Sequence, residues 1–272
     1  MDRWLPAALL LLLLAGCSSG PVIDTRYTAV SQDSRVQYVI LHYTSSGLDR
    51  SLNHLAHGGV SSHYLIDRQP PTIYRLVDES RRAWHAGESS WNGRTWLNST
   101  SIGIELVHYG YHDTSEGRIW PDYEPAQIEA LIVLLRDILQ RHGLGPERVL
   151  GHSDVSPQRK VDPGPMFPWQ QLADAGVAIW PDAAEVQQWS AQLNQCLPPI
   201  DWFQLALTEF GYTQTVTGEL DRATRNVLAA FQMRFRPQLH DGDPDSETAA
   251  LLAALSPKAA DQLSTEQVGW SC

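Results

Sequence analysis

Short hydrophobic runs between residues 36 and 152 predict the strands of a sheet. Each run is dense in β-branched and aromatic residues, and several are apolar at nearly every position. Strands without polar alternation are typical of a sheet that is covered on both faces. We therefore expect a central sheet between other layers of structure. The predicted strands are Val36–Thr44, Ser61–Asp67, Thr72–Val77, Thr100–Val107 and Arg148–His152.

Helical periodicity fills the gaps between these runs. From Pro125 to Gly143 apolar residues recur at spacings of three and four, with a proline suited to a first helical position and a glycine suited to the C-terminal cap. A weaker helical pattern spans Leu48 to Gly58. The order of strands and helices indicates an α/β domain over residues 36–180.

The pattern changes after residue 180, where the strand signals vanish. Residues 181–198 read as a helical connector that ends at a pair of prolines. Residues 199–258 contain three amphipathic helical segments and no cluster of titratable groups. Because an active site needs such a cluster, we expect a small all-α, three-helix domain that binds a partner, followed by a tail over residues 259–272.

The N-terminus predicts an exported lipoprotein. An apolar run of about eleven residues follows Arg3, and it is too short to cross the roughly 30 Å hydrocarbon core as a helix. The sequence "LAGC" resembles a bacterial lipobox, which implies a signal peptide over residues 1–16, lipid on Cys17 and, with serine following, the outer membrane. An uncleaved anchor helix is the alternative. Residues 17–35 are polar and aperiodic, so we expect a tether.

Charge and cysteine content narrow the range of partners. A net charge of −11 and a pI near 5.3 argue against nucleic acid, because affinity for phosphates comes mostly from Lys and Arg. If Cys17 carries lipid, Cys196 and Cys272 remain as candidates for a disulfide in an oxidising compartment. Two free thiols are the alternative. No pattern in the sequence indicates an oligomeric state.

Three predicted strands end on a side chain that can do chemistry: His42, Glu105 and His152. Sites in open α/β sheets gather outside the carboxyl ends of strands, so we expect these side chains to meet. The proline-rich segment after His152 carries Lys160 and Asp162, on what we expect to be a loop with no regular helix or strand. Two histidines and an aspartate supply three ligands and leave a fourth position open, as in catalytic zinc sites. The alternative is that each histidine is an ordinary hydrogen-bonded residue.

Several motifs occur in an order typical of one enzyme family. On these motifs residues 36–180 resemble zinc-dependent N-acetylmuramoyl-L-alanine amidases of the amidase 2 type. The resemblance implies a central mixed β-sheet flanked by helices and, with the lipobox, a periplasm-facing lipoprotein in the outer membrane of a Gram-negative bacterium. Residues 199–258 are similar to the three-helix peptidoglycan-binding module often joined to such amidases. The motifs are "LHYT", "SSHYLI", "AWHAG", "LNSTSIGIEL" and "GHSDVSPQRKVDPGPMFPW", with "GELDRATRNVLAAFQ" in the C-terminal segment.

The resemblance assigns a role to each residue of the predicted site. It makes His42, His152 and Asp162 the zinc ligands, Glu105 the general base and Lys160 the group that stabilises the oxyanion. The bond cut would join the muramic acid lactyl group to L-alanine of a peptidoglycan stem peptide. Related members often carry cysteine as the third ligand, whereas this chain has aspartate.

The motif "AWHAG" is expected to line a substrate groove. We expect Trp84 as an apolar wall, His85 and Ala86 as contacts, and Asn98 as a residue that holds the groove or binds peptide. A core position explains Trp84 equally well, and a turn position explains Asn98. A nearby His108 could tune Glu105, and its role is open. Five further histidines are interpreted as structural or surface residues: His54, His57, His63, His112 and His142.

Two other functions are compatible with parts of this pattern. The first is a peptidoglycan-binding lipoprotein without catalysis, which the presence of all three ligands with Glu105 and Lys160 disfavours. The second is a zinc endopeptidase, but the sequence contains no HExxH motif. The sequence therefore favours a zinc amidase with peptidoglycan and muropeptides as partners.

Overall fold

A computed structural model describes residues 20–21, 23–115, 117–193 and 197–266. The chain divides into two units, Met1–Asp33 and Ser34–Cys272. The described residues of the first unit form no helix or strand and are exposed. The predicted signal peptide, and all three cysteines with the predicted lipid and disulfide, lie outside the described residues. In the part of the chain that the structure describes, every helix is too short or too polar to cross a membrane.

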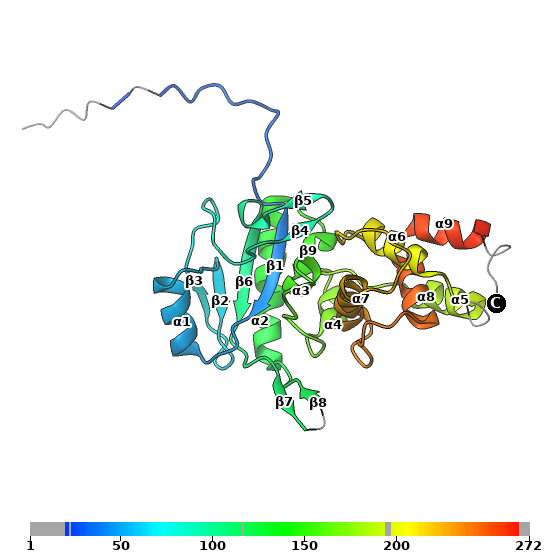
Figure 1. Ribbon diagram of the computed structural model, residues 1–272. Helices are drawn as coiled ribbons and strands as arrows, with labels where there is room; N and C mark the ends of the chain where they lie inside the picture. The colour runs from blue at the N-terminus through cyan, green and yellow to red at the C-terminus, as the bar shows by residue number, and fades with distance from the viewer. Residues whose placement is uncertain (1–19, 22, 116, 194–196, 267–272) are drawn as a thin grey trace, which may run out of the picture. The chain divides into compact units, whose positions relative to one another are not determined.

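The second unit is built on a five-stranded sheet in the order β3-β2-β6-β1-β9 (Figure 1). All five predicted strands are present, each shorter than its hydrophobic run. Four are parallel and β3 is antiparallel to β2, so the expected mixed sheet is confirmed. The strands are β1 (Tyr38–Tyr43), β2 (Tyr64–Ile66), β3 (Ile73–Arg75), β6 (Ser101–Leu106) and β9 (Val149–Gly151).

Alternate residues of β1 enter two separate hydrophobic cores. Val39 and Leu41 join one core with the apolar side of α2 (Pro125–His142), which crosses behind the sheet (Figure 1). Gly143 ends this helix in the left-handed region, with a φ of 64°, as its sequence predicts. The predicted helix α1 (Leu48–His57) packs beside the β3 edge through a small third cluster.

Tyr38 and Ile40 belong to the other core, together with buried residues of the C-terminal helices. The connector and the three predicted helices are all present, and Asp221 and Asp245 cap α7 and α8 through their side chains. The sequence reading missed a further helix, α9, in which Ala259 and Leu263 are fully buried. The helices are α5 (Ala183–Leu193), α6 (Ile200–Phe210), α7 (Arg222–Phe235), α8 (Ser246–Leu255) and α9 (Pro257–Glu266).

The segment after β9 differs from the prediction of a loop without regular structure. His152–Val155 forms one helical turn, α3, before the first proline of the segment at Pro157. Asp154 caps this turn by accepting a hydrogen bond from the Gly151 N–H, and this local pairing is the physical reason for the difference. Other short elements were also not predicted. They are β4 (Ser90–Trp91), β5 (Arg94–Thr95), β7 (His112–Thr114), β8 (Gly117–Ile119), α4 (Trp169–Asp174) and the 3-10 turns Leu97–Ser99 and Pro146–Arg148.

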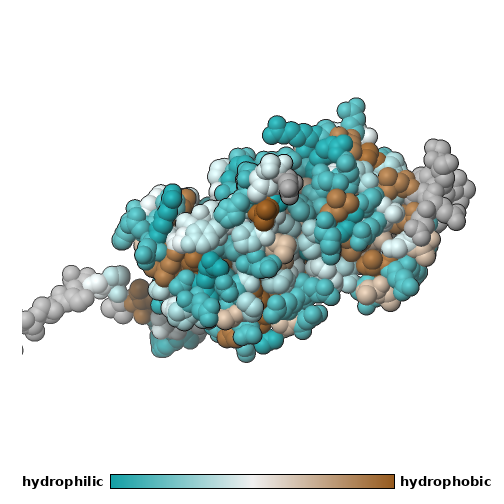
Figure 2. Space-filling view, turned by 90° about the horizontal axis from the view of Figure 1, so that it is seen from below, coloured by the Kyte–Doolittle hydropathy of each residue, from teal (hydrophilic) through white to brown (hydrophobic). Residues whose placement is uncertain are grey.

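The surface seen from below, toward the end that carries the β7–β8 hairpin, is mainly hydrophilic (Figure 2). Hydrophobic residues are scattered over it in small groups rather than in one broad patch. This face is therefore better suited to a polar ligand than to a large apolar one.

Candidate metal centre and active site

Three side chains from distant parts of the sequence converge at the carboxyl end of β1. The Nδ1 atoms of His42 and His152 lie 2.9 Å apart, and Asp162 Oδ2 lies 3.2 Å from the first and 3.0 Å from the second. All three residues are buried. His42 ends the buried part of β1, His152 opens α3, and Asp162 follows the proline-rich excursion. The structure therefore brings together the three residues that the sequence predicts as metal ligands.

The hydrogen bonds behind His152 decide which of its nitrogens faces the centre. Its Nε2 lies 3.1 Å from the Ala86 carbonyl oxygen, which can only accept. In the neutral ring the proton is therefore on Nε2, and the Nδ1 lone pair points at His42 and Asp162.

A longer chain of hydrogen bonds orients His42. The Ser101 hydroxyl donates to the Leu97 carbonyl at 2.6 Å, so it must accept from His85 Nε2 at 3.1 Å. His85 Nδ1 is then an acceptor, and at 3.0 Å it receives the Nε2 proton of His42. The Nδ1 lone pair of His42 therefore also faces the centre. We call Leu97, Ser101, His85 and His42 the relay.

The position of His85 depends on Gly103 in β6. A Cβ atom at Gly103 would lie 2.3 Å from His85 Cγ, so the ring lies directly on the glycine backbone. Gly103 and Glu105 share one face of β6, because side chains alternate along a strand. His42 pairs with Glu105 in the parallel register, which places both on that same face.

The electrostatics of the three side chains favour a cation. Burial and the charge of His152 lower the pKa of His42 to about 4, so its ring is neutral near pH 7. Burial by itself would raise the pKa of Asp162, but the close approach of His152 and His42 holds it well below its ordinary value. Two lone pairs and a carboxylate oxygen thus face one another with no proton between them. Such a donor set fits a zinc ion with one further position open.

Glu105 lies beside this centre as a carboxylate with an unused atom. Its Oε2 is buried and has no hydrogen-bond partner among the residues that the structure describes. Burial and the nearby charge of Asp162 raise its pKa to about 8, while the positive Lys160 opposes the shift. Glu105 and Lys160 line one cavity of about 550 Å³ with the three converging residues. A carboxyl with such a pKa is suited to accept and return a proton near neutral pH.

The four residues predicted to bind substrate fall into two groups. Trp84 is 52% exposed and lines the cavity, so it is not a core residue. Asn98 is buried and its Oδ1 accepts hydrogen bonds from the N–H groups of His85 and Ala86, at 3.0 and 2.7 Å. Since both ring nitrogens of His85 are occupied by the relay, the structure supports positioning by these three residues more than contact with a ligand. Their contact with substrate stays a prediction.

His108 does not contact Glu105. Its Nδ1 accepts from the Gly110 N–H, its Nε2 lies 3.1 Å from the Pro121 carbonyl, and its ring stacks on Tyr123 at 4.2 Å. The ring is therefore fully used in holding this loop.

Other residues of the site were missed by the sequence reading. Ser101 completes the relay, and Asp154 caps the turn that carries His152. Arg159 and Tyr111 line the cavity. A serine at the start of a predicted strand gave no sequence signal, whereas the spacing of Asp154 after Gly151 matches a helix cap.

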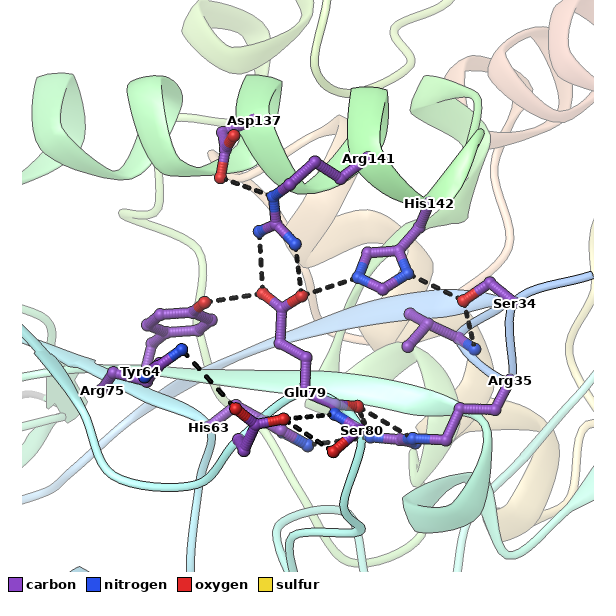
Figure 3. A network of polar contacts seen from close by, with 12 residues as sticks. Ser34, Arg35, His63, Tyr64, Arg75, Glu79, Ser80, Asp137, Arg141 and His142 are labelled. Carbon is purple, nitrogen blue, oxygen red and sulfur yellow. Dashed lines mark hydrogen bonds and ion pairs between the residues drawn. The ribbon is translucent and has the colours of Figure 1, made fainter. Parts of the chain in front are cut away.

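A second group of titratable side chains lies at the opposite end of β1, around Glu79 (Figure 3). Its carboxylate accepts from Arg141 at 2.5 and 2.9 Å, from the Tyr64 hydroxyl at 2.6 Å and from His142 at 2.7 Å. Burial would raise the pKa of Glu79, but the hydrogen bonds from Arg141, Tyr64 and His142 lower it to about 2. We call these four residues the Glu79 cluster. Arg141, Tyr64 and His142 all donate hydrogen bonds to the Glu79 carboxylate, so both of its oxygens have partners. The cluster is therefore suited to stabilising the fold rather than to chemistry.

Known families match two parts of the chain. Residues 32–165 match the family described as N-acetylmuramoyl-L-alanine amidase, and residues 197–252 match a family of peptidoglycan binding domains. The 1,6-anhydro-N-acetylmuramyl-L-alanine amidase AmpD of Enterobacter cloacae is 38% identical over 118 residues, 43% of this chain and 58% of that protein.

Longer matches cover both parts. The N-acetylmuramoyl-L-alanine amidase AmiD of Escherichia coli is 44% identical over 271 residues, 94% of this chain and 97% of that protein. Its structure in complex with anhydro-N-acetylmuramic acid-L-Ala-D-gamma-Glu-L-Lys aligns with a TM-score of 0.80 over 87% of this chain and 94% of that one, at 42% identity. AMPDH3 of Pseudomonas aeruginosa aligns with a TM-score of 0.81 over 88% and 99%, at 40% identity. On the evidence of its fold, its buried His-His-Asp centre and these matches, the chain belongs to the N-acetylmuramoyl-L-alanine amidase family.

Proposed function

We propose that this protein is a zinc-dependent amidase that hydrolyses the bond between the lactyl group of muramic acid and L-alanine of a peptidoglycan stem peptide. One observation carries the proposal. His42, His152 and Asp162 present three converging acceptor atoms, with an unpartnered Glu105 carboxylate oxygen in the same cavity. Three ligands with a free proton carrier beside them form the minimum set for metal-assisted hydrolysis.

The roles of the residues follow from their chemistry. His42, His152 and Asp162 would hold the zinc ion, which when bound activates a water molecule and polarises the scissile carbonyl. Glu105 would take a proton from the attacking water and return it to the leaving amine, because its Oε2 is free and its pKa lies near 8. Lys160 would place a positive charge beside the oxygen of the reacting carbonyl as negative charge develops there.

The wall of the cavity is proposed to hold the muropeptide. Trp84 would present an apolar face to it, while Asn98 would keep the backbone of His85 and Ala86 in place behind that face. The AmiD complex contains an anhydromuramic peptide, which supports a ligand of this class here.

The C-terminal segment and the N-terminus complete the proposal. The match of residues 197–252 supports binding of peptidoglycan by the C-terminal helices. The lipobox-like "LAGC" supports an anchor on Cys17 in the outer membrane, with the enzyme facing the periplasm and acting in cell-wall turnover. Labelling with a radioactive fatty acid, compared between the natural chain and Cys17→Ala, tests the anchor.

A digest of purified muropeptides tests the activity. With zinc bound, mass spectrometry is expected to find free stem peptides beginning at L-alanine and sugars that retain the lactyl group. Anhydro and intact muropeptides in parallel digests define the preference. If the zinc-loaded protein left all muropeptides intact, or cut only bonds inside the peptide, the proposal would be wrong.

A further inference from the structure

A buried ion pair links the C-terminal helices to the turn that carries His152. Arg234 Nη1 of α7 donates to Asp154 Oδ2 of α3 at 2.7 Å, and the two side chains are 2% and 1% exposed. The Tyr212 hydroxyl, just after α6, donates to the other oxygen of this carboxylate at 2.8 Å. Arg234 Nη2 also lies 3.2 Å from the Val149 carbonyl in β9. Two C-terminal side chains therefore hold the single acidic group of this turn.

Asp154 has a direct effect on the metal ligands. Its Oδ2 also accepts from the Gly151 N–H at 2.8 Å, so it fixes the start of the one-turn helix whose first residue is His152. The end of the proline-rich segment, next to Asp162, packs against Gly151 as well. A Cβ atom at Gly151 would lie 2.8 Å from Cδ of Pro163, the neighbour of Asp162. A shift of Asp154 would therefore move one ligand directly and press on the segment that carries another.

A second contact joins α7 to the same loop. Gln158, between His152 and Lys160, donates to the Ala223 carbonyl at 3.0 Å and accepts from Asn226 Nδ2 at 2.8 Å. Helix α7 thus contacts the segment between His152 and Lys160 at two residues, Asp154 and Gln158.

We propose that Arg234 and Tyr212 are positioning residues for the metal centre, which act through Asp154 to set the orientation of His152. The C-terminal helices then have two roles, since they build part of the metal centre as well as contributing the predicted peptidoglycan-binding surface. This inference rests on the proposed zinc site and goes further, because it assigns part of the zinc affinity to residues outside the amidase match.

The physical reason is the burial of the carboxylate. Asp154 is 1% exposed, so loss of Arg234 would leave its buried carboxylate without the partner of its ion pair. Removal of one partner of a buried pair is costly, and the structure relaxes by moving the group toward water. For Asp154 such a movement breaks the cap at Gly151. Orienting groups behind metal ligands typically change metal affinity by about 10–100-fold.

The test measures zinc affinity of the full chain by competition with a chelator. Arg234→Met keeps an unbranched apolar stem and removes the charged guanidinium, and we expect zinc binding weakened about 10–100-fold. Tyr212→Phe removes only the hydroxyl, keeps the ring and is expected to lose about tenfold. If Arg234→Met does not fold, Tyr212→Phe still decides the question. The visible absorption bands of the cobalt-substituted protein should shift in both variants, because they report ligand geometry.

Arg236→Met is the matched control. Arg236 is a buried arginine two residues away, but its ion pairs are with Asp245 and Glu247 inside the C-terminal helices. This variant should lower the thermal unfolding temperature and keep the natural zinc affinity and cobalt spectrum. Unchanged zinc affinity in Arg234→Met and Tyr212→Phe, or an equal loss in Arg236→Met, would overturn the inference. Failure of the natural protein to bind zinc would instead contradict the proposed function.

Discussion

Two glutamates of the sheet domain, both partly buried, have pKa values displaced in opposite directions. Glu79, at one end of β1, has its pKa lowered to about 2 despite burial, because Arg141, Tyr64 and His142 all donate to its carboxylate. Glu105, at the other end, has its pKa raised to about 8 by burial and the nearby charge of Asp162. Its Oε2 has no donor in the described part of the chain.

This difference in pKa distinguishes a cluster that stabilises the fold, around Glu79, from a site suited to a reaction, around Glu105. In the Glu79 cluster the side chains neutralise one another, so the charges hold α2 against β2 and the chain before β1 (Figure 3). At the metal centre three acceptors face each other and a carboxylate is left without a donor. Buried polar groups without hydrogen-bond partners lower the stability of a fold, and they are retained where they bind a ligand or take part in a reaction.

The largest expected effect separates the two glutamates by activity. Glu105→Gln keeps the shape of the side chain and removes its ability to take a proton, so we expect the kcat for muropeptide hydrolysis to fall about 10²–10⁴-fold. The zinc content, measured by atomic emission, should remain that of the natural protein. Glu79→Gln is the matched control, and its kcat should stay within about twofold of the natural value. A similar loss of kcat in both variants would remove the distinction.

The relay can be broken without touching a metal ligand. Ser101→Ala removes the acceptor of the His85 Nε2 proton, so the tautomers of His85 and His42 are no longer fixed. We expect zinc affinity, measured by chelator competition, to fall about tenfold. Ser99→Ala, an exposed serine close in sequence, should leave the affinity unchanged. Equal affinities for Ser101→Ala and the natural protein would show that the relay does not orient His42.

In the metal-free protein, the two glutamates should change the free energy of unfolding in opposite directions as pH rises. The lowered pKa of Glu79 contributes stability that is present above about 4.5 and is lost as pH falls toward 2. The raised pKa of Glu105 gives the reverse, with stability present below about 4.5 and lost as pH rises through 8. Urea unfolding across this range should show both limbs.

Each glutamine variant should flatten one limb only. Glu79→Gln should also lower the free energy of unfolding by about 1–3 kcal/mol at pH 7, because it removes an acceptor from several charged or hydroxyl donors. If Glu79→Gln left the acid limb in place, the lowered pKa would not be the source of acid sensitivity.

The smallest expected effect concerns the exposed wall of the cavity. Trp84→Ala should raise the KM for muropeptides several-fold, on the order of 1 kcal/mol of binding, with little change in kcat. Trp96→Ala is a suitable control, since Trp96 is also exposed, at 65%, and does not line the cavity. The KM values of both variants are measured by steady-state kinetics. Equal KM values for Trp84→Ala and Trp96→Ala would refute a substrate role for Trp84.

The sequence predicted the strands and the main helices because their signals are local. The apolar run of β1 and the period of α2 are visible in windows of a few residues. Short hairpins such as β4–β5 were missed because strands of two residues give no periodic signal, and α9 was missed because it contains few large apolar residues. The turn α3 was missed because proline content suggested a loop, although the first proline comes only after the turn has ended.

The sequence by itself predicted which residues would meet at the candidate metal centre, because His42, Glu105 and the segment from His152 to Asp162 stand in motifs at recognisable spacings. Only the tertiary structure decided which atoms converge and what holds them. The relay through Ser101 and the ion pair from Arg234 to Asp154 join residues that are far apart in the chain or give no local pattern. Hydrogen bonds and burial depend on distances across the fold, so a sequence can name the groups that do chemistry while the folded chain sets their protonation and direction.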